Sequence, residues 1–127
     1  MARLRNRPAA LGALSIVLGA FLLSSCSNAA AIGAARQACT QVERSLTTYG
    51  KVASAPSPSA SATLRAKAQS QLLSGLHFAA AATSADGGYN SLMTTISEAS
   101  RVPEGLLVPS LRRQCQVIRS ANPFLTQ

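Results

Sequence analysis

Several residue types on which protein chemistry depends are scarce in this chain. The 127 residues include no tryptophan, one histidine, four acidic residues and only 4% aromatic residues. Valine, isoleucine and aromatic residues are too sparse for a sheet, whereas alanine, the best intrinsic helix former, and serine dominate. Binding of single-stranded nucleic acid is disfavoured, because no aromatic residues interleave with the basic ones as a stacking platform requires. We therefore expect one small all-α domain and no nucleic-acid partner.

The few groups that could perform chemistry are scattered along the sequence. A serine–histidine–aspartate set would need His77, Asp86 and one of many serines, but the pattern puts His77 mid-helix and Asp86 in a turn. A metal site lacks clustered ligands for the same reason. The simplest interpretation of His77 is a partly exposed or hydrogen-bonded side chain, and haem ligation is the alternative. We predict that the chain is not an enzyme and holds no cofactor.

The longest apolar run, residues 9–23, is too short to span a membrane. It contains 15 residues, whereas a bilayer-spanning helix needs about 20. Arg3, Arg5 and Arg7 precede it, and small residues follow it. A positive segment, an apolar segment and a small-residue stretch are the three parts of a secretory signal. We therefore predict that residues 1–25 are a signal peptide.

The string Leu23-Ser24-Ser25-Cys26, at the end of this run, resembles the lipobox of bacterial lipoproteins. In that family the cysteine receives a diacylglycerol, the leader is removed, and the acylated cysteine becomes the N-terminus. The resemblance implies lipid attachment at Cys26, a short tether over residues 26–29, and a location on the extracytoplasmic face of the cell membrane. The alternatives are an ordinary secreted protein with Cys26 free or paired, or a short uncleaved anchor.

Three cysteines in an exported protein leave one without a partner. Lipidation would give Cys26 a role, and an oxidising compartment would pair the remaining Cys39 and Cys115. These two residues lie 76 positions apart, so a disulfide would fasten the last helix of the domain to the first. Such a bridge typically contributes about 2–4 kcal/mol. The alternative is two unrelated buried thiols.

Helical periodicity predicts four helices in a domain over residues 30–122, followed by a tail over residues 123–127. The first helix runs to about Val52, and a proline-containing linker over residues 53–60 separates it from a second helix. That first helix carries one apolar face: Ile32, Ala35, Cys39, Val42, Leu46 and Tyr49. Cys39 lies on this face, so we expect it to point inward.

The other helices follow the same pattern. The second, capped by Ser61 or Thr63, runs to about residue 83, and Asp86 or Asn90 caps a third. The last helix has Pro109 in its first turn, where proline is tolerated, and an inner face that includes Cys115. Four helices with short connections predict a small antiparallel bundle.

Three stretches of the domain carry a family resemblance: Ala38-Cys39-Thr40-Gln41-Val42-Glu43-Arg44-Ser45-Leu46, Leu92-Met93-Thr94-Thr95-Ile96-Ser97-Glu98, and Arg101-Val102-Pro103-Glu104 with the later Gln114-Cys115. Together they resemble a group of small actinobacterial exported proteins and lipoproteins. The resemblance covers most of the chain from Arg36 to Cys115. It implies an envelope location and a linked cysteine pair, and it implies no activity.

From Cys26 onward nine basic residues face four acidic ones, a mild net charge of +5. This charge fits contact with anionic lipid and also a merely soluble protein. Two functions agree with the sequence. The first is a membrane-anchored, non-catalytic accessory module that presents a helical face to an envelope protein. The alternative is a binder of haem or a small apolar ligand, although alanine-rich inner faces draw helices together and disfavour a large cavity.

Overall fold

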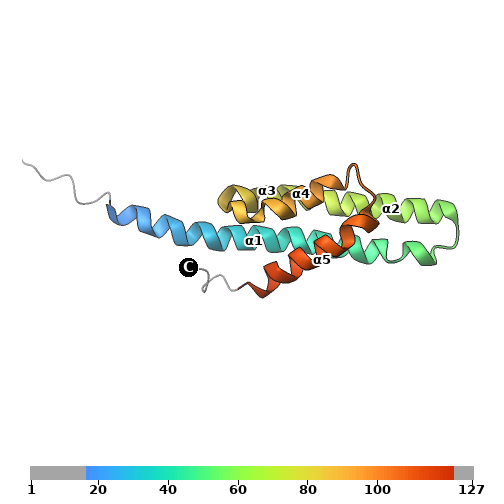
Figure 1. Cartoon of the computed structure of the whole chain (residues 1–127), viewed down its shortest axis with the longest axis horizontal. Helices are drawn as coiled ribbons and strands as arrows, with labels where there is room; N and C mark the ends of the chain where they lie inside the picture. Colours follow the sequence, from blue (N-terminus) through green and yellow to red (C-terminus); the bar gives the residue numbers. More distant parts are fainter. Residues whose placement is uncertain (1–16, 122–127) are drawn as a thin grey trace, which may run out of the picture.

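The domain is built along one long helix. The computed structural model describes the backbone of residues 17–121 and the side chains of residues 28–121, and every regular element in it is helical (Figure 1). The helices are α1 (Val17–Tyr49), α2 (Pro58–Leu73), α3 (Leu76–Ala85), α4 (Asn90–Glu98) and α5 (Glu104–Ser120), with 3-10 turns η1 (Val52–Ser54) and η2 (Gly87–Tyr89). The predicted all-α helical bundle is confirmed.

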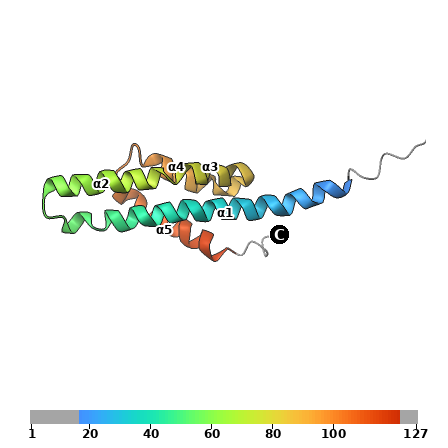
Figure 2. The ribbon, with the colours of Figure 1, turned by 180° about the vertical axis from the view of Figure 1, so that it is seen from behind.

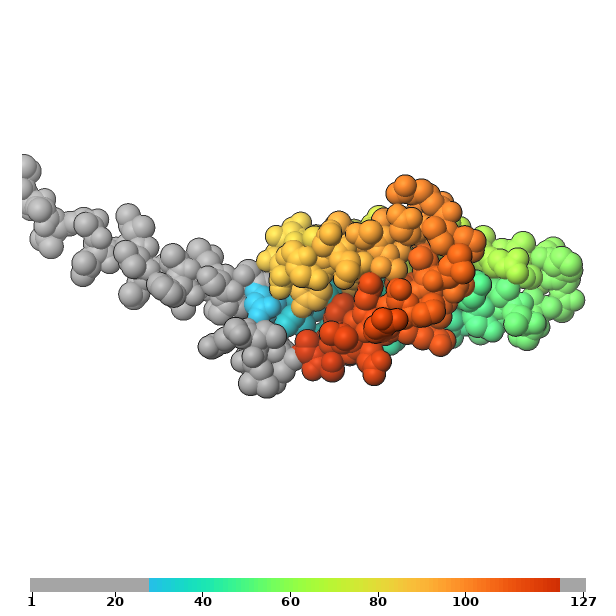
Figure 3. Space-filling view, in the orientation of Figure 1, coloured from blue at the N-terminus to red at the C-terminus, as the bar shows by residue number. Residues whose placement is uncertain are grey.

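The shorter helices cover α1 from two sides. α2 and α3 run back along α1 after the turn that follows it, and α4 packs against α3 (Figures 1 and 2). α5 contacts both α1 and α4, and the space-filling view shows it lying across the surface of α1 (Figure 3). α1 is therefore the central helix, with α5 on one side and α2 and α3 on another.

The predicted inner face of α1 is confirmed. Ile32, Ala35, Cys39 and Val42 are buried, and Leu46 and Tyr49 are partly buried. The buried surface of α1 is wider than one stripe, because helices pack on two of its sides. In the part of α1 whose side chains are described, the additional buried residues are Ala31, Ala38, Ser45 and Thr48.

Small residues bring α3 close to α1. Ala79 and Ala82 of α3 are fully buried, as the alanine-rich sequence predicts. Gly75, just before α3, allows the closest approach: a Cβ placed there would lie 3.3 Å from the carbonyl oxygen of Ala38 and 3.2 Å from Cβ of Gln41. A larger side chain at this position would push α3 away from α1.

The predicted second helix is divided in two at Ser74 and Gly75. α2 ends at Leu73 and α3 begins at Leu76, so the expected single helix is wrong, although both parts continue in the same general direction (Figure 1). The apolar pattern passes through the break without interruption. Glycine lowers helix stability by about 1 kcal/mol, and here its contact with α1 accounts for its presence.

The boundaries of α1 and α2 differ from the prediction. α1 already includes residues 26–29, predicted as a tether, because no glycine or proline interrupts the chain from position 21 to 32. The linker over residues 53–60 is shorter than expected: η1 occupies part of it, and Pro58 takes the first position of α2. The cap is Ser57, whose Oγ accepts a hydrogen bond from the Ala60 N–H at 3.2 Å, rather than Ser61 or Thr63.

The last two helices also depart in detail. The sequence spacing places Tyr89, Met93, Ile96 and Ser100 on the inner face of the third helix, but Ser100 is exposed and Leu92 is buried instead. α5 begins at Glu104, so Pro109 lies in its second turn. Pro109 is exposed, and the carbonyl of Gly105 that its missing N–H leaves free can be satisfied by water. The tail over residues 123–127 lies outside the described residues.

Candidate functional site

Two of the three cysteines meet in the structure. Cys39 of α1 and Cys115 of α5 form a disulfide, with Cα atoms 5.4 Å apart, and both residues are buried. The predicted pair is therefore confirmed, and it joins the first helix to the last. Position 26 lies within α1, but the side chain of Cys26 and the residues before position 17 lie outside the described part of the structure.

The structure does not assemble His77 and Asp86 into a catalytic group. His77 is exposed on α3, where its ring lies against Phe78 with centroids 3.8 Å apart. Asp86 follows α3, and its carboxylate accepts a hydrogen bond from the Gly88 N–H at 2.8 Å. No group of three histidine, cysteine or acidic residues able to hold a metal ion occurs among the described residues.

The length and apolarity of the described helices can be compared with those that a membrane-spanning helix needs. Within residues 17–121, no helix has a stretch long and apolar enough to cross a bilayer.

A buried polar network at the start of α5 was not predicted from the sequence. Ser45 Oγ of α1 lies 2.6 Å from the Ala68 carbonyl oxygen of α2 and 2.5 Å from Glu104 Oε1 of α5. Ser45 is fully buried, and Glu104 is 8% exposed. Three helices therefore meet at one hydroxyl group.

The proton count of this network depends on the ionisation of Glu104. A serine hydroxyl has one proton, and the Ala68 carbonyl can only accept it. Ser45 can then still accept a hydrogen bond, which a neutral Glu104 carboxyl donates and a carboxylate cannot. Burial raises the pKa of Glu104 above its ordinary value of 4.5. The other use of the Ser45 proton, donation to the Glu104 carboxylate in place of the Ala68 carbonyl, offsets part of that rise. The network is fully hydrogen-bonded between these three groups only when Glu104 is neutral.

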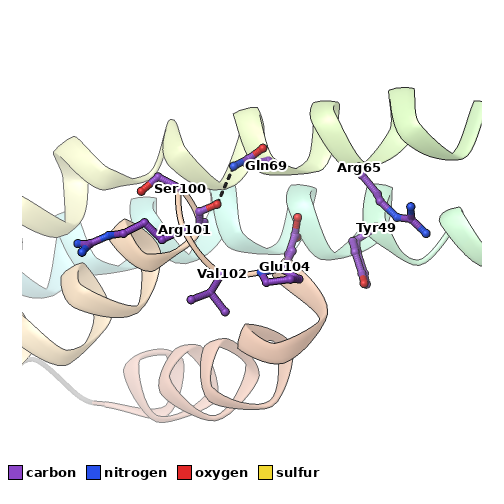
Figure 4. Close-up of a pocket in the computed structure, with 9 residues that line it drawn as sticks. Tyr49, Arg65, Gln69, Ser100, Arg101, Val102 and Glu104 are labelled. Carbon is purple, nitrogen blue, oxygen red and sulfur yellow. Dashed lines mark hydrogen bonds between the residues drawn. The ribbon is translucent and has the colours of Figure 1, made fainter. Parts of the chain in front are cut away.

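A pocket of about 330 Å³ opens beside this network, between α1, α2 and the connection from α4 to α5 (Figure 4). The Glu104 side chain points from the start of α5 toward α1, and Gln69 of α2 donates a hydrogen bond to the Ala99 carbonyl at 2.6 Å. Glu104 Oε2 has no hydrogen-bond partner and no contact with solvent. A ligand in the pocket could not reach that oxygen without movement of the chain, so the network fastens helices and offers no ready binding group.

The outer face of α5 combines exposed apolar side chains with exposed basic ones. The two exposed large apolar side chains, Leu106 and Val117, both belong to it. Arg112 and Arg113 are exposed and make no hydrogen bond or ion pair with any described residue, whereas Arg119 pairs with Glu43 of α1. Glu104, the single acidic residue of α5, is buried. The exposed charges of α5 are therefore all positive.

Shallow grooves flank α5 on both sides. A groove of about 250 Å³ lies between α5 and the start of α4, and Tyr89, Leu92, Arg113 and Val117 are among its lining residues. A second groove of about 260 Å³ lies between α5 and α1, and its lining includes Arg112 and Arg119. α5 thus combines exposed apolar and basic groups with open edges, a character that suits contact with a surface.

Sequence reasoning missed Ser45 and Glu104, although a weak signal was present. Ser45 falls beside Leu46 at the edge of the apolar face of α1, where a small polar residue indicates a buried hydrogen bond. Glu104 follows Pro103 at the start of a helix, which is an ordinary exposed position for an acidic residue. Nothing local predicts that they meet, because they are 59 residues apart.

The fold defines a disulfide-linked all-α bundle. Comparison with known proteins finds no match for the chain among protein families, curated proteins or solved structures.

Proposed function

We propose that the chain is an exported lipoprotein, held on the extracytoplasmic face of the cell membrane by an acylated Cys26. The disulfide between Cys39 and Cys115 carries this proposal. Such bonds persist in oxidising compartments and are rare in the cytosol. Cys26 then has no cysteine left in the chain with which to pair, and lipidation after removal of residues 1–25 gives it a role.

The start of the packed core supports the proposal. Among residues 28–121, whose side chains are described, the first buried ones are Ala31 and Ile32, five and six residues after Cys26. At about 1.5 Å per helical residue, the core begins only about 8 Å along α1 from the proposed lipid attachment. A mature chain that starts at Cys26 would keep all of the described core and hold it close to the bilayer.

We infer further that the domain is a non-catalytic accessory module. All four acidic residues have structural contacts: Glu43 with Arg119, Asp86 with the Gly88 N–H, Glu98 with Arg101 at 3.6 Å, and Glu104 with Ser45. The four acidic residues lie in four separate contacts, none of which includes His77, and this arrangement favours a non-catalytic role. A rigid, small, membrane-tethered bundle is suited to presenting a helical face to an envelope protein.

Metabolic labelling with palmitate tests the anchor. We would compare the wild-type chain with Cys26→Ser, using the double variant Cys39→Ser and Cys115→Ser as the matched control. The control loses the disulfide but keeps the lipobox. We expect label and membrane retention in the wild type and in the control. Cys26→Ser should carry no label, and only those molecules that still bear the leader should stay in the membrane. Equal membrane retention of Cys26→Ser with its leader removed would contradict the proposal.

Crosslinking in cells followed by purification tests the accessory role. The expected result is a protein captured in stoichiometric amount by the wild-type lipoprotein and lost in Cys26→Ser. A stoichiometric small apolar molecule or haem, with no protein partner, would contradict the accessory role and support a ligand-binding function.

A further inference from the structure

Three side chains on α5 form a stripe that faces away from the core. Leu106 is 72% exposed and Val117 is 63% exposed, and Arg113 lies between them in sequence. Spacings of seven and four residues put all three on one side of a helix. The buried residues Leu111 and Cys115 lie on the opposite side. Exposed apolar groups and a free arginine therefore share the centre of the outer face of α5.

The position of α5 relative to Cys26 is fixed by three links to α1. The Arg36 guanidinium donates a hydrogen bond to the Ala121 carbonyl at 2.7 Å, just beyond the end of α5. The disulfide joins the two helices, and Arg119 pairs with Glu43. Cys26 precedes Arg36 by ten residues, which corresponds to about 15 Å of helix. The C-terminal half of α5 thus lies at the end of the domain near the proposed anchor.

We propose that the outer face of α5, defined by Leu106, Arg113 and Val117 with Arg112 on its flank beside α1, rests on anionic lipid headgroups of the membrane that holds the anchor. This inference depends on the proposed lipidation of Cys26. Charge complementarity identifies the occupant, because every exposed charge of α5 is positive. Arginine side chains extend toward phosphate while their apolar stems and neighbouring apolar residues enter the interface.

The geometry allows both attachments at once. α5 lies to one side of α1 (Figures 1 and 3). The domain can therefore tilt about the few residues between Cys26 and the packed core until the outer face of α5 meets the headgroups. The groove between α4 and α5, with Arg113 and Val117 in its lining, gives lipid groups a recess beside the stripe. α2 and α3 pack mainly against α1 and have little contact with α5. Their outer surfaces would then remain available to a protein partner.

The absence of tryptophan from the chain permits a direct test. We would introduce Val117→Trp into the full chain, purify the processed protein from membranes, and reconstitute it into vesicles. One set contains phosphatidylcholine alone and the other contains phosphatidylglycerol, both with doxyl-labelled lipid as quencher. Ala81→Trp, at an exposed position on α3, is the matched control. We expect the indole of the Val117→Trp protein to be quenched and blue-shifted on anionic vesicles only, and that of the Ala81→Trp protein to remain unquenched on both.

Charge variants test the cause of the docking. Replacing Arg112 and Arg113 by glutamine should lower the ratio of docked to undocked protein by about five-fold for each arginine. The matched control replaces two other exposed basic residues by glutamine: Lys51, just after α1 at the end of the domain away from Cys26, and Lys67 of α2. This change should leave the ratio unchanged. Added salt should weaken docking of the parent Val117→Trp protein, since the contact is electrostatic.

Vesicle flotation separates this inference from the proposed function. Failure of the protein to float with phosphatidylcholine vesicles would overturn the lipid anchor. Flotation with both vesicle types but no quenching of the Val117→Trp protein would overturn the α5 contact alone, as would equal quenching on neutral and anionic vesicles. Flotation with quenching restricted to anionic vesicles supports both.

Discussion

Replacement of Glu104 by glutamine should make the domain more stable at alkaline pH and leave its stability at acidic pH nearly unchanged. Glutamine has almost the same shape, and its amide N–H can donate to Ser45 as a neutral carboxyl does. The hydrogen bonds to Ala68 and Ser45 would therefore be kept. The variant differs from the wild type mainly in having no ionisable group at this position.

The sign follows from the raised pKa of Glu104 in the folded state. Because the folded chain holds the proton more tightly than the unfolded chain, the contribution of Glu104 to stability is complete below its unfolded pKa. That contribution is lost as the pH rises through the folded pKa. Each unit by which folding raises the pKa corresponds to about 1.4 kcal/mol. For a domain of this size, 1 kcal/mol changes the melting temperature by about 4–8 °C.

A competing effect at the same position is smaller. Glu104 is the first residue of α5, and a negative charge at a helix N-terminus is stabilising by about 0.3–1 kcal/mol at exposed sites. Burial of a charge without a partner costs several kcal/mol. Neither Arg65 nor Arg101, which also line the pocket, forms an ion pair with Glu104. The cost of burial therefore determines the sign.

The assay is urea unfolding of the wild type and Glu104→Gln from pH 4 to pH 8, with the disulfide intact. The difference in free energy of unfolding removes the contributions of all other titrating groups. We expect the two proteins to be equally stable near pH 4 and the variant to be more stable at pH 8. A difference that is constant with pH, or a wild type that is more stable at pH 8, would refute the neutral state of Glu104.

Three further predictions concern stability, each measured by thermal unfolding. Replacing Cys39 and Cys115 by serine should cost about 2–4 kcal/mol under oxidising conditions, and strong reductant should abolish the difference between variant and wild type. Gly105→Ala should change stability by less than about 1 kcal/mol, because its Cβ would lie 2.5 Å from the Tyr49 hydroxyl, which can move aside, while alanine favours the helix; a larger loss would show that Tyr49 is held in place. Ser57→Ala should cost about 1 kcal/mol through loss of the α2 cap, and no change would show that the cap is dispensable.

The features that local pattern determines were predictable. The inner face of α1 follows from residues spaced three and four apart, and Cys39 lies on it, so its burial and pairing could be expected. The ion pair of Glu98 and Arg101 follows from a spacing of one helical turn.

The features that depend on tertiary contact were not predictable. The break between α2 and α3 depends on the approach of Gly75 to α1, which no local pattern reveals. The network of Ser45, Ala68 and Glu104 requires three helices to be in place. The outer face of α5 was also missed, because the prediction for the last helix followed only its inner face.

Intact mass spectrometry of the protein purified from cell membranes tests the central claim most directly. We predict a chain that begins at Cys26 and carries a diacylglyceryl group on that residue, with a mass lower by two hydrogen atoms than that of the fully reduced form. A chain with unmodified Cys26, or one whose first residue lies elsewhere, would contradict the lipid anchor.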